Sequence, residues 1–462
     1  MEKRLVRVPH ALVIMFGITL LVTILSYFVP AGSFQRIVSE ATGRLVVVPG
    51  TFEFLTSTPI GFENYITAFL RGFKKAGDVI FVVLSGGVMF AILDRTKSIE
   101  KTVGVFVRTL GMSRKKAIVI IMTLLYGVLG VAVGYENNIA LVPIAAMVSL
   151  AIGGDLILAA GMSVGAMTIG FGLSPINPYT VGLGHKLAQL PLFSGSGLRS
   201  ILCFLGIVLM CYYNLRYLKK IVENKTNGLG DGLNTEGLSL KQSLSSYKME
   251  GKDWVIFSVF IVGLTYTIYA IFNYGWFFQE LSGMFLVIGL VAGLIGRLNG
   301  EAISQAALEG IRLTSGGAFM VGFAASITIL LEDASIIDTL CFYASEGLKQ
   351  VPSSMSSIIM ALAQTGINYL IPSGSGQALA TLPIMLPLGE LVGVSNQITI
   401  LAFQIGDGVS NLCNPTLGGL VAMLSICRVP FDRWLKFIFP LTLVLLGISF
   451  LFLMIASFIN YT

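Results

Sequence analysis

Charged residues are scarce in this chain, and histidine and cysteine are few and scattered. Of its 462 residues only 12% are Asp, Glu, Lys or Arg, whereas a soluble domain carries roughly a quarter. The two histidines, His10 and His185, lie far apart, and the five cysteines show no CxxC spacing. This composition argues against an ordinary soluble protein, a disulfide framework and a site of metal catalysis.

Long apolar runs fill most of the sequence instead. Hydrophobic residues make up 55% of the chain, and its mean hydropathy is +0.84. Several runs approach or exceed the ~18 residues that cross the ~30 Å hydrocarbon core of a bilayer. They are continuous rather than alternating, and the first lacks a signal-peptide cleavage site, so we predict an all-α polytopic membrane protein. The nine predicted spans are 11–29, 78–94, 155–183, 198–217, 253–272, 277–296, 314–331, 396–427 and 434–458.

Two further apolar runs are interrupted by polar residues. The run 116–152 contains GYENNIALV at 134–142, and the run 354–389 contains PSGSGQALATL at 372–382. We predict that each run is a re-entrant hairpin, which enters and leaves on the same face of the membrane. The nine spans then alternate from a cytoplasmic N-terminus, and 22 of the 30 Lys and Arg lie inside, as the positive-inside rule requires.

The two halves of the chain resemble each other at a nearly constant spacing. The stretch 65–99 aligns with 303–337, and INP at 176–178 aligns with CNP at 413–415, at offsets of 237 to 238 residues. An odd number of predicted spans separates the two copies, which predicts the inverted repeats of a secondary transporter. The predicted parts are a first repeat (1–218, with hairpin 116–152 and broken helix 155–183), a mobile cytoplasmic linker (219–252), an extra membrane helix (253–275), a second repeat (276–462, with hairpin 354–389 and broken helix 396–427) and two interfacial amphipathic arms (62–76 and 300–313).

Each repeat contains two breaks in its helical pattern, one at the hairpin tip and one at an Asn-Pro pair. Asn177 and Asn414 precede prolines, which disfavour helix at both positions. A single break is commonly a simple kink. Four breaks at matched positions indicate a binding site, because irregular backbone at membrane depth is tolerated where it is buried in protein or lines a wet cavity. Half-helix N-termini there suit anions, and unwound carbonyls suit Na⁺.

Two carboxylates fall within apolar surroundings, Glu136 at the first tip and Asp407 before the sequence SNLCNPT. A buried carboxylate is costly unless it is paired or protonated. We interpret both as ligands of a cation or amine, or as carriers of a coupling proton; the alternative is a structural hydrogen bond. No Lys or Arg is expected at the depth of the breaks, and Glu332 and Asp333 are expected to be solvated at a span edge.

Several stretches resemble a known family: INPYTVGLGHKLAQLPLFSGSGLR (176–199), PSGSGQALATLPIMLPL (372–388) and LAFQIGDGVSN (401–411). They are similar to the YfcC-like branch of the anaerobic four-carbon dicarboxylate carrier (DcuC-like) family, in the ion transporter superfamily. The resemblance covers essentially the whole chain. It implies inverted repeats, re-entrant hairpins, an elevator-type transport domain and a homodimer in the bacterial inner membrane.

Better-studied superfamily members bind Na⁺ and substrate through Ser-Asn-Thr motifs at the tips and breaks, a string that is absent here. Na⁺ is a candidate ligand near Asn138, Asn177, Ser375 and Asn414. The candidate substrate- and ion-binding residues are Glu136, Asn137, Asn138, Ser174, Asn177, Thr180, Ser373, Gly374, Ser375, Asp407, Ser410, Asn411, Asn414 and Thr416.

These observations predict a secondary active transporter of a small, basic amino acid, working by antiport or by coupling to Na⁺ or H⁺. Amides at 373–376 and Asn177 would hold the α-carboxylate, while Glu136 and Asp407 would meet the amino groups or carry the coupling proton. A Na⁺- or H⁺-coupled dicarboxylate carrier is the alternative within transport, and a channel is a further one. A membrane enzyme would need a nucleophile with its base or a set of metal ligands, and the sequence offers neither.

Overall fold

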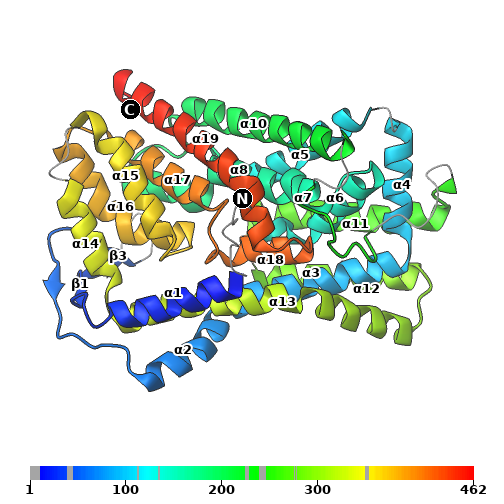
Figure 1. The fold of residues 1–462 in the computed structure, drawn as a ribbon, viewed down its shortest axis with the longest axis horizontal. Helices are drawn as coiled ribbons and strands as arrows, with labels where there is room; N and C mark the ends of the chain where they lie inside the picture. Colours follow the sequence, from blue (N-terminus) through cyan, green and yellow to red (C-terminus); the bar gives the residue numbers. More distant parts are fainter. Residues whose placement is uncertain are drawn as a thin grey trace, which may run out of the picture.

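The computed structural model describes residues 11–38, 45–111, 114–133, 136–223, 228–238, 246–274, 276, 278–348 and 353–461. Helices dominate these residues (Figure 1). Six of the helices are long and apolar enough to cross a membrane, and each contains or closely matches one predicted span. The prediction of a polytopic α-helical membrane protein is therefore confirmed.

The elements of the first half run from α1 to α10. They are α1 (Ala11–Leu25), β1 (Gly32–Ser33), β2 (Arg36–Val38), β3 (Leu45–Val47), β4 (Glu53–Phe54), α2 (Phe62–Lys75), α3 (Gly77–Arg95), α4 (Ser98–Leu110), α5 (Lys115–Val133), the 3₁₀ helix η2 (Glu136–Leu141), α6 (Val142–Ala151), α7 (Leu156–Ala160), the π-helical turn η3 (Gly161–Gly165), α8 (Ala166–Gly172), the π-helical turn η4 (Pro178–Gly182), α9 (Leu183–Leu187) and α10 (Ser196–Glu223).

The second half is helical in every regular element that the structure describes. These elements are α11 (Gly251–Tyr274), α12 (Phe278–Ile295), α13 (Gly300–Asp333), α14 (Ile337–Leu348), α15 (Ser353–Asn368), α16 (Gly374–Leu391), α17 (Asn396–Ser410), α18 (Gly418–Ile426) and α19 (Phe431–Phe458).

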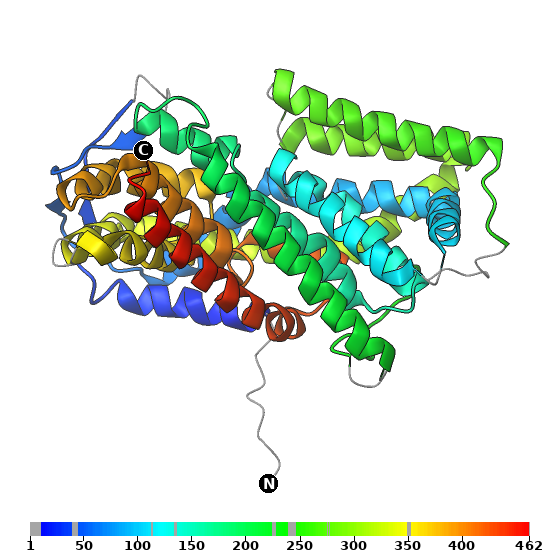
Figure 2. The same ribbon diagram turned by 90° about the horizontal axis from the view of Figure 1, so that it is seen from above.

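The long helices lie at different angles, and the ends of the molecule differ (Figure 1). Helices α1 and α13 lie along one edge, α10 lies along the opposite edge, α19 runs obliquely from near that edge toward the middle, and α4 lies crosswise at one end. Figure 2 shows α10 and α19 crossing the same face, with α11 and α12 set apart from them. At the other end β1 pairs with β4, and β2 pairs with β3, each antiparallel. We call these the α4 end and the strand end.

Helix α13 corrects one prediction. Residues 300–313 are not a separate arm, because α13 continues without interruption through the predicted span 314–331. The polar residues of 300–313 indicate which face of the helix is exposed, but no residue in that stretch interrupts the backbone hydrogen bonds of the helix. In the first half, by contrast, α2 ends at Lys75 and α3 begins at Gly77. The amphipathic pattern of 300–313 therefore predicted correctly that these residues have an exposed face, but wrongly that their helix is separate from the span that follows.

Two described parts of the predicted linker 219–252 have defined contacts. Helix α10 extends into it as far as Glu223, and the segment 228–238 is docked onto neighbouring helices. A backbone amide of this segment donates to Oδ2 of Asp155 at 3.1 Å, and a backbone carbonyl accepts from Nη1 of Arg433 at 2.9 Å. Side chains distant in sequence thus supply the partners that a Gly-rich segment lacks by itself.

Candidate functional site

The first polar tip lies between α5 and α6. Asn138 is buried, and its Nδ2 donates to the carbonyl of Leu129 at 3.4 Å. It lines a largely apolar cavity of about 380 Å³ formed with α11. The side chains of Glu136 and Asn137 lie outside the described part of the structure.

The first broken helix leaves its helical path between Gly172 and Asn177. Oδ1 of Asn177 accepts from the amide of Tyr179 at 2.9 Å, which caps η4, and Nδ2 donates to the carbonyl of Phe171 at 3.1 Å. Oγ of Ser174 donates to a carbonyl of α5 at 3.1 Å. Asn177 therefore ties the two half-helices together and fixes the break.

The second broken helix repeats this arrangement between α17 and α18. Oδ1 of Asn414 accepts from the amide of Thr416 at 2.9 Å, and Nδ2 of Asn414 donates to the carbonyl of Asn368 at 3.0 Å. Nδ2 of Asn368, at the end of α15, lies 2.7 Å from Oγ of Ser410 and 2.7 Å from Oδ1 of Asn411. One asparagine thus holds the hairpin against the break.

The two broken helices approach closely at two glycines. A Cβ placed on Gly172 would lie 2.7 Å from Cα of Gly408, closer than real Cβ atoms come to other atoms. Only glycine at both positions lets these backbones approach so closely. The Asn-Pro breaks follow within a few residues of each glycine, so both lie in the same part of the molecule.

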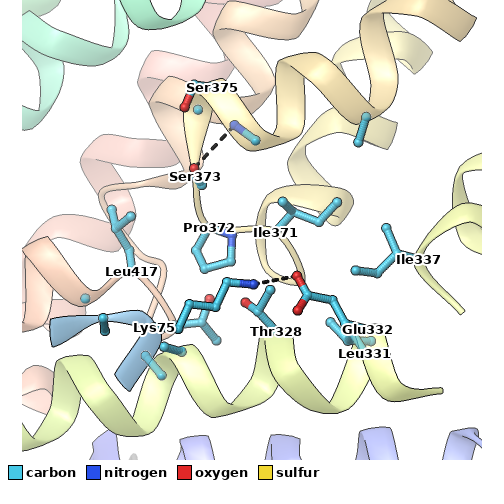
Figure 3. Close-up of a pocket in the computed structure, with 18 of the residues that line it drawn as sticks. Lys75, Thr328, Leu331, Glu332, Ile337, Ile371, Pro372, Ser373, Ser375 and Leu417 are labelled. Carbon is cyan, nitrogen blue, oxygen red and sulfur yellow. Dashed lines mark hydrogen bonds and ion pairs between the residues drawn. The ribbon is translucent and has the colours of Figure 1, made fainter. Parts of the chain in front are cut away.

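A cavity of about 780 Å³ lies beside the second hairpin tip (Figure 3). One wall is formed by the tip 372–376 together with Asn411 and residues 416–419 after the second break. The opposite wall is formed by α13 and the junction of α2 with α3, and the lining continues to β1 at the strand end. Ser373 caps α16, because its Oγ accepts from the amide of Gly376 at 3.3 Å.

Charged side chains, two of them basic, line this cavity beside the second tip. Lys75 lies 2.5 Å from Glu332, and Arg36 lies 2.7 Å from Asp338. Figure 3 shows the Lys75–Glu332 pair beside Pro372 of the tip. These charges come from residues that the sequence places outside the predicted spans, and folding brings them beside the tip. The cavity therefore offers partners for both anions and cations.

Asp407 lies buried directly behind the tip. A Cβ placed on Gly374 would lie 3.3 Å from Oδ2 of Asp407 and 2.7 Å from Cγ2 of Thr180. Oδ1 of Asp407, Oγ1 of Thr180 and Oε1 of Gln404 are buried without a hydrogen-bond partner among the described residues. The N-terminus of α16, at Gly374, contributes partial positive charge nearby. A carboxylate in this position can hold a proton, or can bind a cation such as Na⁺.

The structure brings the predicted site residues of the second half together around the second tip and the second break. Only some of the predicted residues line the cavity. Within the described ranges, no group of three or more His, Cys, Asp or Glu is placed to hold a metal ion. The predicted residues that line the cavity are Ser373, Gly374, Ser375, Asn411 and Thr416; those buried around the breaks are Ser174, Asn177, Thr180, Asp407, Ser410 and Asn414; Asn138 lines the separate cavity.

Comparison with known proteins assigns the family. Residues 8–458 match the family model DcuC, described as C4-dicarboxylate anaerobic carrier. YfcC of Escherichia coli (strain K12), provisionally named a basic amino acid antiporter, is 30% identical over an alignment 473 positions long, gaps included, which spans 93% of this chain and 92% of YfcC. The chain belongs to the DcuC family.

Two solved transporters also match along nearly their whole length. The YdaH transporter of Alcanivorax borkumensis is 15% identical, with a TM-score of 0.45, and the match covers 98% of this chain and 99% of YdaH. MtrF of Neisseria gonorrhoeae is 18% identical, with a TM-score of 0.45, and the match covers 97% of this chain and 95% of MtrF. Membership of DcuC makes the chain a multi-pass membrane transporter of a bacterial family and not an enzyme.

Sequence reasoning missed four residues at the site of this DcuC member. Nε2 of Gln404 donates to the carbonyl of Ser174 at 2.8 Å and so links the second broken helix to the first. Asn368, Lys75 and Glu332 were missed because each gains its role from a distant part of the chain. An amide one turn before Asp407 was a signal for Gln404, but nothing in the sequence pairs Lys75 with Glu332.

Proposed function

We propose that this DcuC family member is a secondary active transporter of small amino acids with a cationic side chain, built from two inverted repeats. The observation that carries the proposal is the buried carboxylate of Asp407 behind a hairpin tip that faces a charged cavity. Such a group can exchange a proton or a cation as the tip moves, which is what coupled transport requires.

Matched contacts between the halves support the inverted repeat. A Cβ on Gly72 would lie 2.6 Å from the amide of Ser326, and a Cβ on Gly310 would lie 2.8 Å from Cα of Val88. Gly72 and Gly310 are 238 positions apart, and so are Val88 and Ser326. One contact thus becomes the other when the two copies exchange roles, as a two-fold axis between the copies requires.

The two breaks support the same relation. The capping pair Asn177 and Tyr179 corresponds to Asn414 and Thr416 at an offset of 237 residues. The contact between Gly172 and Gly408 joins two nearly equivalent positions, as expected for residues beside the axis. In this proposal the breaks and tips belong to a transport domain that moves in an elevator-like way against α13 and its neighbours.

The chemistry of the cavity supports an amino acid as the substrate. The α-carboxylate would lie at the N-terminus of α16, where the first amides and the helix dipole favour an anion. The cationic groups would face the carboxylates of the cavity. YfcC, with its provisional name as a basic amino acid antiporter, supports the same substrate class.

Counterflow into proteoliposomes tests the proposal. Vesicles loaded with arginine should take up labelled arginine or ornithine, and Asp407→Asn should reduce that uptake at least about a hundredfold, as expected when a contact to a charged group is lost. Asp432→Asn is the matched control, because Asp432 lies at the start of α19, 3.9 Å from Lys436 and away from the cavity. Wild-type rates in Asp407→Asn would remove the proposal.

A dicarboxylate carrier is the second candidate, and two observations favour it. The family model is described by C4-dicarboxylate transport, and both Lys75 and Arg36 line the cavity. A thermal-shift series separates the two candidates, using arginine, ornithine, succinate and malate, each with and without Na⁺. Stabilisation by the diacids alone would replace the amino acid proposal with this one.

A further inference from the structure

Two neighbouring carboxylates end helix α13, and both form ion pairs with α2. Glu332 lies 2.5 Å from Nζ of Lys75, and Asp333 accepts from both terminal nitrogens of Arg71. The two pairs share the same two helices and the same charges, so they form a natural comparison. We refer to them as the Lys75–Glu332 pair and the Arg71–Asp333 pair.

The two pairs differ in how firmly they are held. The Arg71–Asp333 pair has a bidentate geometry, and the side chain of Asp333 is 19% exposed. The Lys75–Glu332 pair has a single close contact, and its side chains are 45% and 48% exposed. Exposed single-contact pairs contribute little to stability, whereas bidentate guanidinium–carboxylate pairs are stronger and more rigid. A cationic ligand can therefore take the place of Lys75 on Glu332, but it cannot easily displace Arg71.

The two pairs also differ in position. Lys75 and Glu332 line the 780 Å³ cavity, opposite Pro372 and Ser373 of the second tip (Figure 3). Neither residue of the Arg71–Asp333 pair is part of that lining.

Asp338, the other carboxylate of this lining, has both its oxygens engaged. Its Oδ1 accepts from Nη2 of Arg36 at 2.7 Å, and its Oδ2 accepts from the amide of Phe34 at 2.9 Å. Glu332 is thus the lining carboxylate with an exchangeable partner.

We propose that Glu332 is a cation subsite, which binds the side-chain guanidinium or ammonium of the substrate while the α-carboxylate lies at the tip. Lys75 is its resident counter-ion in the absence of substrate and is displaced when the substrate binds. The inference rests on the proposed function, because it assigns a role to the wall of the cavity in which that substrate binds. It makes Glu332 the residue that separates basic from neutral amino acids.

Arginine and citrulline test this subsite, because citrulline replaces the guanidinium with a neutral group of similar shape. In counterflow the wild-type protein should prefer arginine, and Glu332→Gln should raise the KM for arginine about tenfold or more, with inhibition by citrulline unchanged. Lys75→Gln removes the competing cation and should lower the KM for arginine. Asp333→Asn is the matched control and should keep the wild-type preference.

Two results would overturn the subsite: an unchanged preference in Glu332→Gln, or an equal loss of preference in Asp333→Asn. Failure of the proposed function is seen separately, as an absence of uptake of either amino acid by the wild-type protein. In that case the binding of arginine, measured without transport, tests whether Glu332 is the cation subsite. Arginine must then raise the melting temperature of the wild-type protein more than that of Glu332→Gln, or the subsite is wrong.

Discussion

The two Asn-Pro breaks have similar backbone hydrogen bonds, but the side chains around them differ in polarity. Oδ1 of Asn177 and Oδ1 of Asn414 each accept a hydrogen bond of 2.9 Å from the amide two residues further on, and each asparagine is followed by proline. Asn177 thereby caps η4, whereas Asn414 closes a turn before α18. The side chains that surround these two asparagines differ in the two halves. At four positions offset by 237 residues the first half has Val131, Gly170, Leu173 and Ser174, and the second half has Asn368, Asp407, Ser410 and Asn411.

This difference distinguishes residues that build the broken helices from residues that could bind a ligand. An asparagine that bonds the broken backbone and a close glycine contact are found in both halves, because each half must break a helix within an apolar environment. Within the described residues, Asn368, Asn411 and the buried carboxylate of Asp407 lie together in the second half, beside the tip that lines the charged cavity. Among the described residues, the polar side chains therefore gather around the second break, and the first half contributes Thr180 and the carbonyl of Ser174 beside them.

Replacing Asn368 with the residue of the first half should have the largest effect. Asn368→Val removes the amide that donates to Oγ of Ser410 and Oδ1 of Asn411, both at 2.7 Å. Each buried acceptor left unpaired costs about 1–3 kcal/mol. We expect a lower melting temperature and a loss of counterflow of at least about tenfold.

The reciprocal position provides the control for this prediction. Val131→Ala removes only methyl groups, and the carbonyl of Val131 still accepts from Ser174. Counterflow should therefore be close to wild type in Val131→Ala. Equal losses in the two variants would show that the halves contribute alike and that the second half is not the site.

The glycine contact gives a smaller effect, which tests the frame shared by both halves. Gly408→Ala places a methyl group against the backbone of Gly172 and should destabilise the protein by about 1–3 kcal/mol. Gly447→Ala, in α19, is the control, because a Cβ there meets no atom within 4 Å. It should be neutral or stabilising by up to about 1 kcal/mol. Thermal unfolding in detergent measures both, and an unperturbed Gly408→Ala would contradict the close crossing.

The sequence predicted what depends on local chemistry. Long apolar runs predicted the spans, and the Asn-Pro pairs marked breaks because proline and the residue before it are restricted by neighbouring atoms. The ion pair between Lys75 and Glu332 could not be predicted, since 257 residues separate its members. The polar stretch 300–313 predicts a separate arm, and this prediction is wrong because polarity reports exposure and says little about where a helix ends.

A further difference between the halves lies at the strand end. His185, shortly after the first break, has its Nε2 3.2 Å from Oε1 of Gln397 at the start of α17, and its Nδ1 accepts from the amide of Phe193 at 3.0 Å. Ala422 occupies the corresponding position of the second half, so only the first half has a titratable group there. Burial, followed by the positive charge of Arg199, lowers the pKa of His185, and the hydrogen bond with Gln397 opposes this shift.

The smallest expected effect is a pH dependence of stability that comes from His185. Because its pKa is lower in the folded than in the unfolded state, the unfolded chain binds the proton more readily. The contribution of His185 to stability is therefore complete above the unfolded pKa of about 6.5 and is lost as the pH falls below it, by at most about 1.4 kcal/mol per pH unit. Melting temperatures at pH 7.5 and 5.5 should differ more in the wild-type protein than in His185→Gln. If the melting temperature changes equally with pH in both proteins, the pH dependence comes from groups other than His185.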